Sequence, residues 1–379
     1  MSISAVSVAI RGRSPSEAAR TITDAVRRRP RPSGGVVFAS GVLAERLDQL
    51  AEALAASALG LPMILASGAG VLTERGEIEG ESAAAALLWS GGNARTFCAR
   101  GNGADELGER LAKAVAAGND ARRGTLVVFM RPDGVAPHAL EPLQQLGGIS
   151  TIFGAGSVGS PGVLALNADG SVQRGGAAAM LLHGLPVPSV RTSPACRLLM
   201  PLRRITDSAG SMVLELEGEP ALDVLSTVAE GLTDQPLIFA VLAEGDAPPA
   251  GRAEVVVRAV QGVDPIRRGL MVSDEVRPGL RMAFAVRDPG AAKLDLEAVL
   301  RELSQQLAGA APCFGLYLTC AGRGASLYGS YSVDVRMLRA RFGDIPLAGM
   351  HSSFELAPHE GKPTVQLYTG VLALFSQAS

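Results

Sequence analysis

The fold is decided near the C-terminal end, by Phe314-Gly-Leu-Tyr-Leu-Thr319, then Cys320-Ala-Gly-Arg-Gly324, then Asp334-Val-Arg-Met-Leu-Arg-Ala-Arg-Phe342. An apolar run that ends in a glycine-rich turn predicts a buried strand, and the last of these segments predicts a helix. Two further apolar runs, Pro346 to Gly349 and Val365 to Phe375, predict strands. The order of elements is therefore strand, turn, helix, strand, strand.

Two earlier parts of the chain show a similar order of elements. One has apolar runs over 36–39, 63–66 and 82–89 with helical spacing over 43–54, and the other has runs over 126–130, 150–153 and 177–182 with helical spacing over 136–146. Three copies indicate internal duplication, and their long, irregular period indicates a compact body rather than a solenoid. We predict an α/β (α+β) fold of two related halves, with mixed or antiparallel sheets covered by helices.

The length of the chain and one polar link indicate where the halves meet. At 379 residues the chain exceeds what a single hydrophobic core usually fills. The Pro- and Ser-rich segment Val187 to Pro194 separates the halves, and Ser14-Pro-Ser-Glu17 has the pattern of a capping box that opens a helix to about Arg28. We predict an N-terminal helical segment over 1–33, an N-terminal region over 34–194 and a C-terminal region over 195–379.

Composition and charge exclude several classes of function. Hydrophobic residues make up 47% of the chain and the net charge is −2, so we expect a folded protein with no attraction for nucleic acid. No apolar run approaches the roughly 18 residues of a spanning helix, and no basic region precedes the N-terminal apolar residues. We therefore expect a cytoplasmic protein without membrane insertion. The cysteines, Cys98, Cys196, Cys313 and Cys320, and the four histidines show no metal-ligand spacing, so we predict reduced thiols and neither metal nor cofactor.

One glycine-rich segment matches half of a nucleotide-binding pattern. Gly154-Ala-Gly-Ser-Val-Gly159 follows a predicted strand and has the G-x-G-x-x-G spacing. A dinucleotide site also requires a helix to begin there, because the N-terminal amides of that helix bind the pyrophosphate. The apolar run Val163 to Leu166 predicts a strand instead, so we interpret the segment as a turn.

The stretch that begins at Cys320 resembles the C-terminal half of the FIST sensory domain. Members of that family have a "CAGRG" loop after a strand, a helix that ends in "RFGDIPLAG" and a final strand similar to "YTGVLALF", and all three occur here in order. The resemblance covers about residues 34 to 378, and it includes the turn Ser67-Gly-Ala-Gly70 and the joint Ala195-Cys-Arg-Leu198.

This resemblance implies a role in signal input. The family is regarded as a module that binds small ligands such as amino acids, found alone, ahead of signalling outputs or beside an F-box. Because the sequence contains no recognisable output module, the resemblance implies a stand-alone sensor of a small molecule, an amino acid or a related metabolite. A signalling protein partner stays open.

The loop from Cys320 to Gly324 is the first candidate for ligand binding. Gly322 and Gly324 allow backbone amides to approach a ligand closely. Arg323 lies between them and has the planar fork that holds a carboxylate through two hydrogen bonds. The alternative is a glycine-tolerant turn with a solvated arginine and a core cysteine. Given the resemblance, we predict the binding role for Cys320, Gly322, Arg323 and Gly324.

The turn after the next strand is the second candidate. The segment Met350-His-Ser-Ser-Phe-Glu355 brings His351, Ser352 and Glu355 close to one another in the sequence. Glu355 would accept a ligand ammonium while Arg323 holds the carboxylate of the same zwitterion. In the alternative, Glu355 pairs with an arginine of the chain, such as Arg339.

Three more residues complete the predicted site. Ser67 and Gly68 would line the same cavity if equivalent turns of the duplicated units meet at one interface, although an ordinary glycine turn explains them equally well. Arg197 is included because it lies in the joint that the family pattern contains.

Two other classes of function stay open. Cys320 and His351 could form a thiolate–imidazole pair, which would make the protein a cysteine-dependent enzyme acting on a small acyl or electrophilic metabolite. The sequence specifies no oxyanion site, so we assign no catalytic residue and expect binding without turnover. The third class is a scaffold that recruits a protein partner through an exposed apolar surface.

Overall fold

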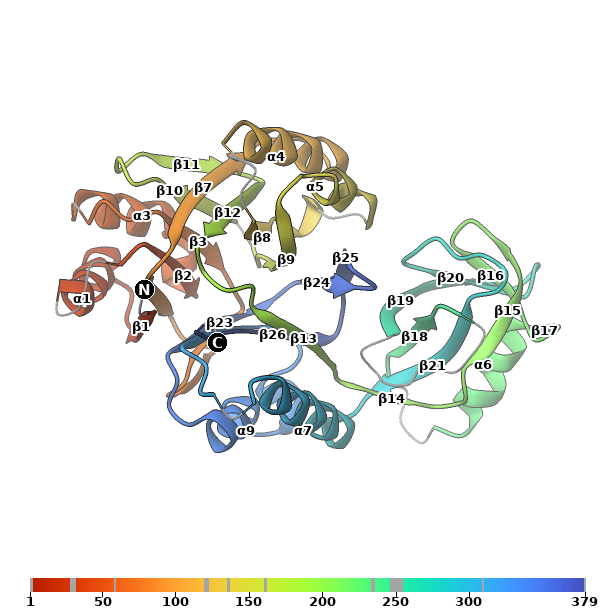
Figure 1. The fold of residues 1–379 in the computed structure, drawn as a ribbon. Coiled ribbons are helices and arrows are strands. Elements are labelled where there is room, and N and C mark those ends of the chain that lie inside the picture. The colour runs from red at the N-terminus through yellow and green to blue at the C-terminus, as the bar shows by residue number, and fades with distance from the viewer. Residues whose placement is uncertain are drawn as a thin grey trace. The chain divides into compact units, whose positions relative to one another are not determined.

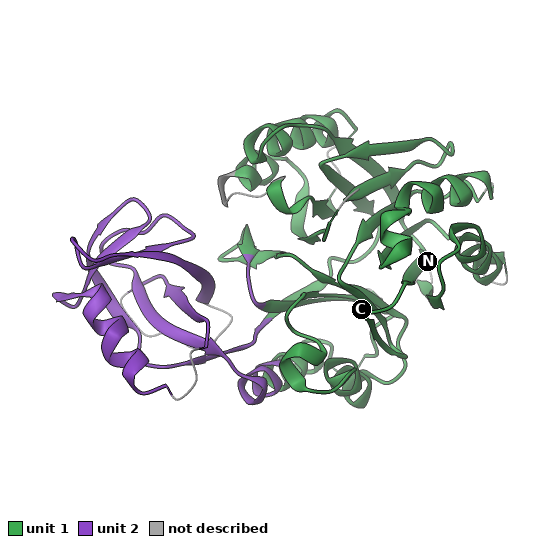
Figure 2. Ribbon diagram, turned by 180° about the vertical axis from the view of Figure 1, so that it is seen from behind, with its two compact units in different colours: residues 1–192, 297–365, 369–379 green, residues 193–296, 366–368 purple. Residues whose placement is uncertain are grey.

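The chain forms two compact units in a computed structural model, which describes residues 3–27, 32–57, 59–118, 123–134, 137–159, 162–232, 236–245, 255–308 and 310–377. Unit 1 comprises Met1–Thr192, Glu297–Val365 and Thr369–Ser379, and unit 2 comprises Ser193–Leu296 and Gln366–Tyr368 (Figure 2). Unit 1 therefore takes its strands from both of the predicted regions of the sequence. The division into 1–33, 34–194 and 195–379 stays a prediction about related stretches of sequence.

Three mixed sheets of six strands each are built from the described residues of unit 1 (Figure 1). The first has the order β1 (Ser4–Arg11), β6 (Ala83–Ser90), β2 (Gly34–Ser40), β3 (Met63–Ser67), β10 (Val163–Leu166), β11 (Val172–Gly175). The second has the order β25 (Lys362–Gln366), β24 (Glu355–His359), β9 (Ile149–Gly156), β8 (Gly124–Met130), β12 (Ala177–His183), β7 (Asn93–Ala99). The third has the order β13 (Ser189–Pro194), β26 (Thr369–Phe375), β22 (Phe314–Cys320), β23 (Leu347–Ser352), β4 (Gly70–Thr73), β5 (Gly76–Glu79).

The centre of each sheet is the predicted strand–helix–strand–strand unit. The parallel pairs β2–β3, β8–β9 and β22–β23 are each connected through helical segments: α2 (Val42–Glu45) with α3 (Leu47–Ala56), α5 (Glu141–Gln144), and α9 (Val333–Phe342). A later strand, β6, β12 or β26, pairs antiparallel with the first strand of each pair. The mixed α/β class and the three repeated units are therefore confirmed.

Each of the three repeated strand–helix–strand–strand elements contributes its next strand to a neighbouring sheet. The strand β4, which follows β3, pairs with β23 of the third sheet, and β10, which follows β9, pairs with β3 of the first sheet. The strand β24, which follows β23, pairs with β9 of the second sheet. Each of the three sheets therefore contains strands from more than one repeated element.

Alternation along the strands divides the apolar residues between two cores. Val36 and Phe38 of β2 belong to a core shared by all three sheets, in which the Phe38 and Phe129 rings lie 5.5 Å apart between centroids. Val37 and Ala39 point to the opposite face and pack under α1 (Pro15–Arg27) and α3. Buried strands with both faces covered therefore appear in the sequence as continuous apolar runs.

Unit 2 is a small closed barrel. Its strands follow the order β14 (Cys196–Leu198), β21 (Arg281–Arg287), β15 (Arg203–Ala209), β16 (Met212–Leu216), β20 (Gly269–Val272), β19 (Val255–Asp264), β18 (Ile238–Ala243), and β17 (Glu219–Pro220) pairs with β16. An additional pairing of β18 with β21 closes the ring, and α6 (Ala221–Glu230) packs against it. Closure removes the open edges that would favour aggregation.

Several predicted boundaries differ from the structure. The predicted turn over 154–159 is wrong in part, because β9 continues to Gly156, whose N–H donates to the Phe354 carbonyl at 2.8 Å. The helix predicted over 136–146 is a 3-10 turn followed by the short α5, and residue 136 lies outside the described residues. A long helix, α7 (Pro289–Gln306), precedes β22. Strands β1, β4, β5 and β7 were not predicted, because small and charged residues interrupt their apolar pattern.

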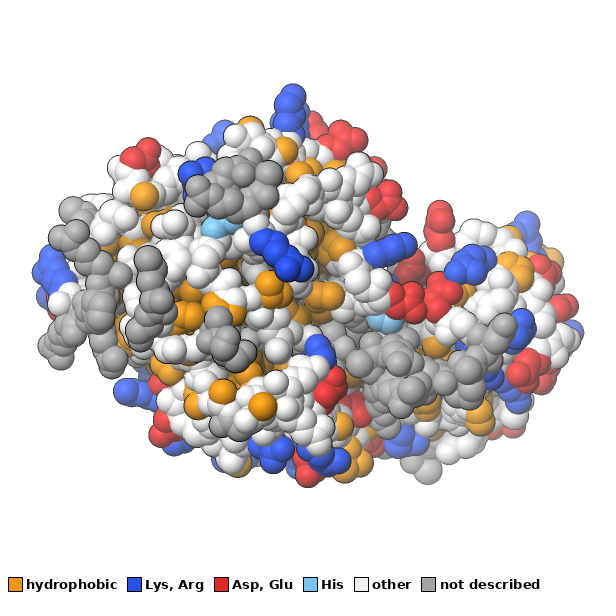
Figure 3. Space-filling view, viewed as in Figure 1, with side chains coloured by type: hydrophobic (Ala, Val, Ile, Leu, Met, Phe, Trp, Pro, Cys, Tyr) orange, Lys and Arg blue, Asp and Glu red, His pale blue; other side chains and the backbone are white. Residues whose placement is uncertain are grey.

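Two surface properties bear on partners. None of the described helices is long and apolar enough to cross a membrane; α4 (Ala104–Gly118) and α7 both carry charged residues. On the face shown in Figure 3, acidic and basic side chains lie interspersed with scattered hydrophobic ones. This mixture agrees with the net charge of −2.

Gly349→Ala should destabilise unit 1, because a Cβ there would overlap the backbone carbonyl of Tyr317 on the neighbouring strand. Overpacking of this kind lowers the free energy of unfolding by about 1–3 kcal/mol, measurable as a shift of the urea midpoint. Gly147→Ala is the control, since a Cβ at Gly147 meets nothing within 4 Å. Equal midpoints for the two variants would contradict this packing.

Candidate functional site

One face of the third sheet carries polar residues in place of core residues. Glu77 and Glu79 lie two positions apart on β5 and therefore on the same face. In register, Gly70 is opposite Glu79, and Thr319 is opposite His351. The alternate residues Val71, Ile78, Leu318 and Met350 point to the other face and lie in the shared core. A row of polar side chains, Thr319, His351 and Glu79, therefore crosses strands that are otherwise apolar.

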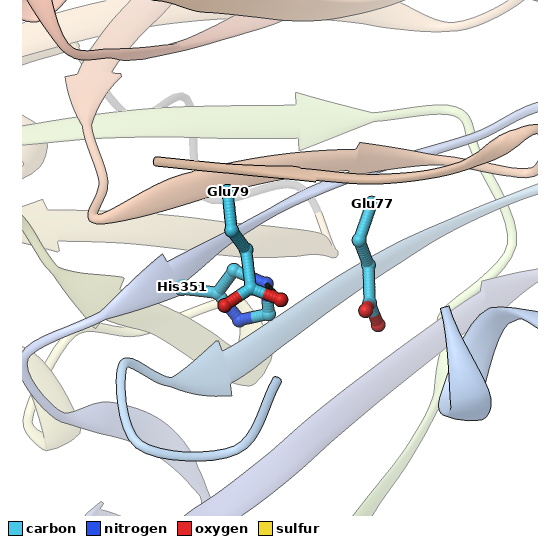
Figure 4. A group of neighbouring side chains, drawn as sticks. All are labelled: Glu77, Glu79 and His351. Atoms are coloured by element: carbon cyan, nitrogen blue, oxygen red, sulfur yellow. Dashed lines mark ion pairs between the residues drawn. The ribbon is translucent and has the colours of Figure 1, made fainter. Parts of the chain in front are cut away.

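Gly70 lies between His351 and Glu79 and allows these two side chains to approach each other. A Cβ at Gly70 would lie 2.7 Å from His351 Cδ2 and 3.0 Å from Glu79 Cγ. The His351 ring is buried, and its Nδ1 lies 2.7 Å from Thr319 Oγ1. Its Nε2 lies 3.9 Å from Glu79 Oε1 and has no hydrogen-bond partner among the described residues (Figure 4). Burial lowers the pKa of His351, which favours the neutral ring.

The segment over 320–342, which follows β22 and is called the motif segment below, is held over this face by a buried ion pair. Arg323 and Asp334 are each 1% exposed, and Arg323 Nε lies 2.6 Å from Asp334 Oδ2. The hydroxyls of Tyr317 and Tyr328 donate to the same carboxylate at 2.8 and 2.6 Å. Burial raises the pKa of both tyrosines well above the ordinary value, so they remain donors. The Arg323 guanidinium thus holds a carboxylate of its own chain and is not the solvated side chain of the alternative interpretation.

Two backbone amides of the same segment bind the glutamates of β5. Ala325 N–H donates to Glu79 Oε1 at 2.9 Å, and Ser332 N–H donates to Glu77 Oε2 at 2.6 Å. Glu77 N–H in turn donates to Ser332 Oγ at 2.9 Å. A Cβ at Gly324 would overlap the Glu79 carboxylate, so a larger residue here would displace that carboxylate from its contact with Ala325 N–H. Burial raises the pKa of Glu77 to about 7 against the opposing effect of the Ser332 hydrogen bond, and the negative charges of Asp334 and Glu79 add to the rise.

A cavity of about 490 Å³ opens beside β5. Its charged lining residues are Arg11, Arg75, Glu77, Glu79 and Glu81, and Ser332 and Tyr331 lie on its wall. Because Glu77 and Glu79 also bind the motif segment, the cavity and that segment share two side chains. The buried His351 ring lies next to Glu79, with its Nε2 3.9 Å from Glu79 Oε1.

The structure places the remaining predicted residues as follows. The Ser67 hydroxyl donates to the Val158 carbonyl at 2.7 Å, and a Cβ at Gly68 would lie 2.8 Å from Met350 Cβ, so this turn packs against β23. The Gly322 carbonyl accepts from Ser326 Oγ at 3.0 Å. Arg197 belongs to unit 2, where its Nε lies 3.3 Å from Asp288 Oδ2.

Glu355 and Ser352 form a buried polar pair instead of a contact with Arg339. Arg339 pairs with Asp344 at 2.6 Å, whereas Glu355 is 0% exposed and its Oε1 lies 2.7 Å from Ser352 Oγ. Ser352 Oγ also donates to the Thr319 carbonyl at 2.9 Å. A hydroxyl has one proton, so both contacts are satisfied when the Glu355 carboxyl is protonated. Burial raises the pKa of Glu355 well above its ordinary value, in agreement with this state.

The arrangement of β22 bears on the cysteine-enzyme alternative. Thr319 faces His351 across the two parallel strands and holds its ring, while Cys320 is the next residue along β22 and is opposite Ser352. Successive residues of a strand point to opposite faces, so the Cys320 thiol and the His351 imidazole project in different directions. The geometry does not favour a thiolate–imidazole pair.

Sequence reasoning missed the residues that line the cavity. Glu77 and Glu79 were not singled out because β5 is only four residues long and has a single buried apolar side chain between them. Their charged–apolar–charged alternation after a glycine was the available signal, since it is typical of a half-buried strand. Asp334 was predicted only to begin a helix.

These features define an α/β protein whose larger unit joins three repeated strand–helix–strand–strand elements around one core and carries a charged cavity at a sheet edge. The chain matches the FIST N domain over residues 34–219 and the FIST C domain over 221–358. It therefore belongs to the FIST family, a class of ligand-binding sensory domains of signal transduction.

Similar proteins occur in mycobacteria. The chain is 28% identical over 356 residues to the uncharacterized protein Rv0628c of Mycobacterium tuberculosis, and this alignment covers 91% of each chain. It is 29% identical over 321 residues to the uncharacterized protein Mb0898c of Mycobacterium bovis, and this alignment covers 80% of each chain. Among solved structures, T. maritima PurL complexed with FGAR aligns with a TM-score of 0.24 and 11% identity, over 99% of this chain and 72% of that chain, which is too dissimilar to support an argument.

Arg323→Ala should strongly destabilise unit 1. Removal of one partner of a buried ion pair leaves the Asp334 charge uncompensated and costs about 3–5 kcal/mol, measurable by urea denaturation. Arg339→Ala is the matched control, because its pair with Asp344 is 47% and 68% exposed and so contributes little to stability. Similar losses for both variants would show that the Arg323 pair is not a structural support.

Glu355→Gln should remove part of the pH dependence of stability. The raised pKa of Glu355 means that the folded chain keeps a proton that the unfolded chain releases. The free energy of unfolding should then fall as the pH rises above the unfolded value near 4.3, with a slope of up to about 1.4 kcal/mol per pH unit. The variant should gain stability relative to the parent as the pH rises above about 5, as thermal unfolding would show. The exposed Glu360→Gln should leave the slope unchanged, and parallel curves for Glu355→Gln and the parent would contradict the buried proton.

Proposed function

We propose that this protein is a cytoplasmic sensor that binds a small zwitterionic metabolite, such as an amino acid, in the cavity beside β5. The cavity volume of about 490 Å³ lies within the roughly 300–1,000 Å³ typical of small-molecule sites. Its lining carries both signs of charge, which suits a ligand that has a carboxylate and an ammonium group.

Arg75 is the proposed anchor for the ligand carboxylate. Its side chain is 83% exposed, and its Nε lies 3.7 Å from Glu74 Oε1, which is too long for a hydrogen bond. The guanidinium can therefore turn towards a ligand and bind it through two parallel hydrogen bonds. Glu77 and Glu79 provide the negative charge on the same wall for the positive end of the ligand.

The main support for this proposal is that two residues lining the cavity, Glu77 and Glu79, also bind the motif segment. Glu79 binds Ala325 N–H and Glu77 binds Ser332 N–H, so a ligand that engages either carboxylate changes the hold on the segment over 325–332. Ligand binding then biases the position of this surface segment, which a signalling partner can recognise. In this proposal the motif segment is supported by its own first residues, Cys320, Gly322, Arg323 and Gly324.

The test is a thermal-shift screen of the full chain against amino acids, their keto acids and amines. A ligand at about one hundred times its dissociation constant stabilises the folded state by about 2.7 kcal/mol, which gives a clear shift. Arg75→Ala should abolish the shift produced by a hit and leave the stability of the free protein nearly unchanged, because the side chain is exposed.

Arg20→Ala is the matched control, because Arg20 is an exposed arginine of α1 that does not line the cavity. It should bind every hit as the parent does. A hit that survives Arg75→Ala would place the ligand elsewhere, and a screen without any hit would remove the support for zwitterion binding.

A further inference from the structure

Three potential metal ligands converge at the inner end of the cavity. Glu77, Glu79 and His351 each offer one ligand atom, and these atoms all lie within 4.8 Å of one another. Figure 4 shows both carboxylates extending from the same strand, with the Glu79 carboxylate next to the imidazole ring. Metal–ligand bonds of about 2.0–2.2 Å require only small rotations of these side chains to reach one ion.

The His351 ring provides an independent reason to place an ion here. It is 1% exposed, and its Nε2 has no hydrogen-bond partner among the described residues although it points towards Glu79. A distance of 3.9 Å to Glu79 Oε1 is too long for a hydrogen bond. A buried nitrogen without a partner costs free energy, and an ion between these two atoms would satisfy both.

The surrounding contacts orient the three side chains as metal ligands are usually oriented. Thr319 Oγ1 lies 2.7 Å from His351 Nδ1, so an N–H on Nδ1 leaves the Nε2 lone pair directed at the carboxylates. Ala325 N–H and Ser332 N–H each occupy one carboxylate oxygen of Glu79 and Glu77. Each carboxylate can accept these hydrogen bonds and still coordinate an ion, because its two oxygens have about four lone-pair positions.

We infer that Glu77, Glu79 and His351 bind one divalent transition-metal ion of the Zn²⁺ type. One nitrogen and two carboxylate ligands suit Zn²⁺, and three protein ligands leave a coordination position open. Because Glu77 and Glu79 line the cavity, that position faces the cavity. The spacing rules applied to the sequence do not detect this set, since two ligands lie on β5 and the third on the distant β23.

This inference goes beyond the proposed function and does not rest on it, since all three ligands come from the protein. A bound ion would occupy the two carboxylates that meet the ligand ammonium in the metal-free protein, so the metal-bound cavity would contact a metabolite through its carboxylate or an uncharged amine. Ion binding is measured without a metabolite, so its failure and the failure of zwitterion binding are separate results.

The test uses the full chain after removal of metals with a chelator, and Zn²⁺ alone as the probe. Calorimetry and elemental analysis should find one tightly bound Zn²⁺ per chain. Glu79→Gln and His351→Gln should each weaken binding by about 100-fold or more, and Thr319→Val, which removes the support of the ring, by about 10- to 100-fold. Co²⁺ in the parent protein should give visible absorption bands of a nitrogen- and oxygen-coordinated ion.

Two control variants remove a carboxylate or an imidazole outside the cluster, Glu45→Gln on α2 and His359→Gln on β24, and both should bind Zn²⁺ as the parent does. Thermal unfolding of each metal-free variant reports whether it is folded, and the Co²⁺ spectrum of the parent needs no variant. Absence of stoichiometric Zn²⁺, or binding that Glu79→Gln and His351→Gln leave unchanged, would overturn the inference.

Discussion

The larger unit depends on the exchange of strands between its three sheets. Each repeated element pairs two parallel strands and then places its next strand at the edge of a neighbouring sheet, as β4 does beside β23. The second strand of each parallel pair therefore receives its outer partner from another element, so that every sheet needs a second element to complete its pairing. One shared aromatic and aliphatic core fills the space between the sheets. Cooperative stability of the whole unit follows from this arrangement, because no element has a complete sheet of its own.

The same exchange creates the polar site. It brings β5, from the first third of the chain, to the edge of a sheet whose centre comes from the last sixth. Charged residues tolerate this position because the segment over 320–342 covers them and supplies hydrogen-bond donors. The buried Arg323–Asp334 pair holds this segment, and removing water from the pair is offset only because two tyrosine hydroxyls complete the network. The most characteristic motif of the family thus acts on the candidate site through its backbone amides and its internal ion pair.

In the proposed function, two carboxylates each have two roles. Glu77 and Glu79 line the cavity and also anchor the covering segment, so any positive group that binds them changes both the charge of the cavity and the hold on that segment. A sensory protein needs such a coupling between an internal site and a surface element. Placing the two contacts on one strand keeps the coupling short and rigid, because β5 itself packs through Ile78 into the core.

The sequence by itself determined the local elements: continuous apolar runs predicted the buried central strands, helical spacing predicted α3 and α9, and ordered motifs identified the family. It could not determine which strand completes which sheet, because pairing between distant segments depends on the packing of the whole core and leaves no local periodicity. It named Arg323 and His351 as site residues without revealing that Asp334 holds the first and Thr319 the second. The tertiary structure alone decided that Glu79 of a short, partly polar strand lies 3.9 Å from His351, since strand exchange brings these two parts of the chain together.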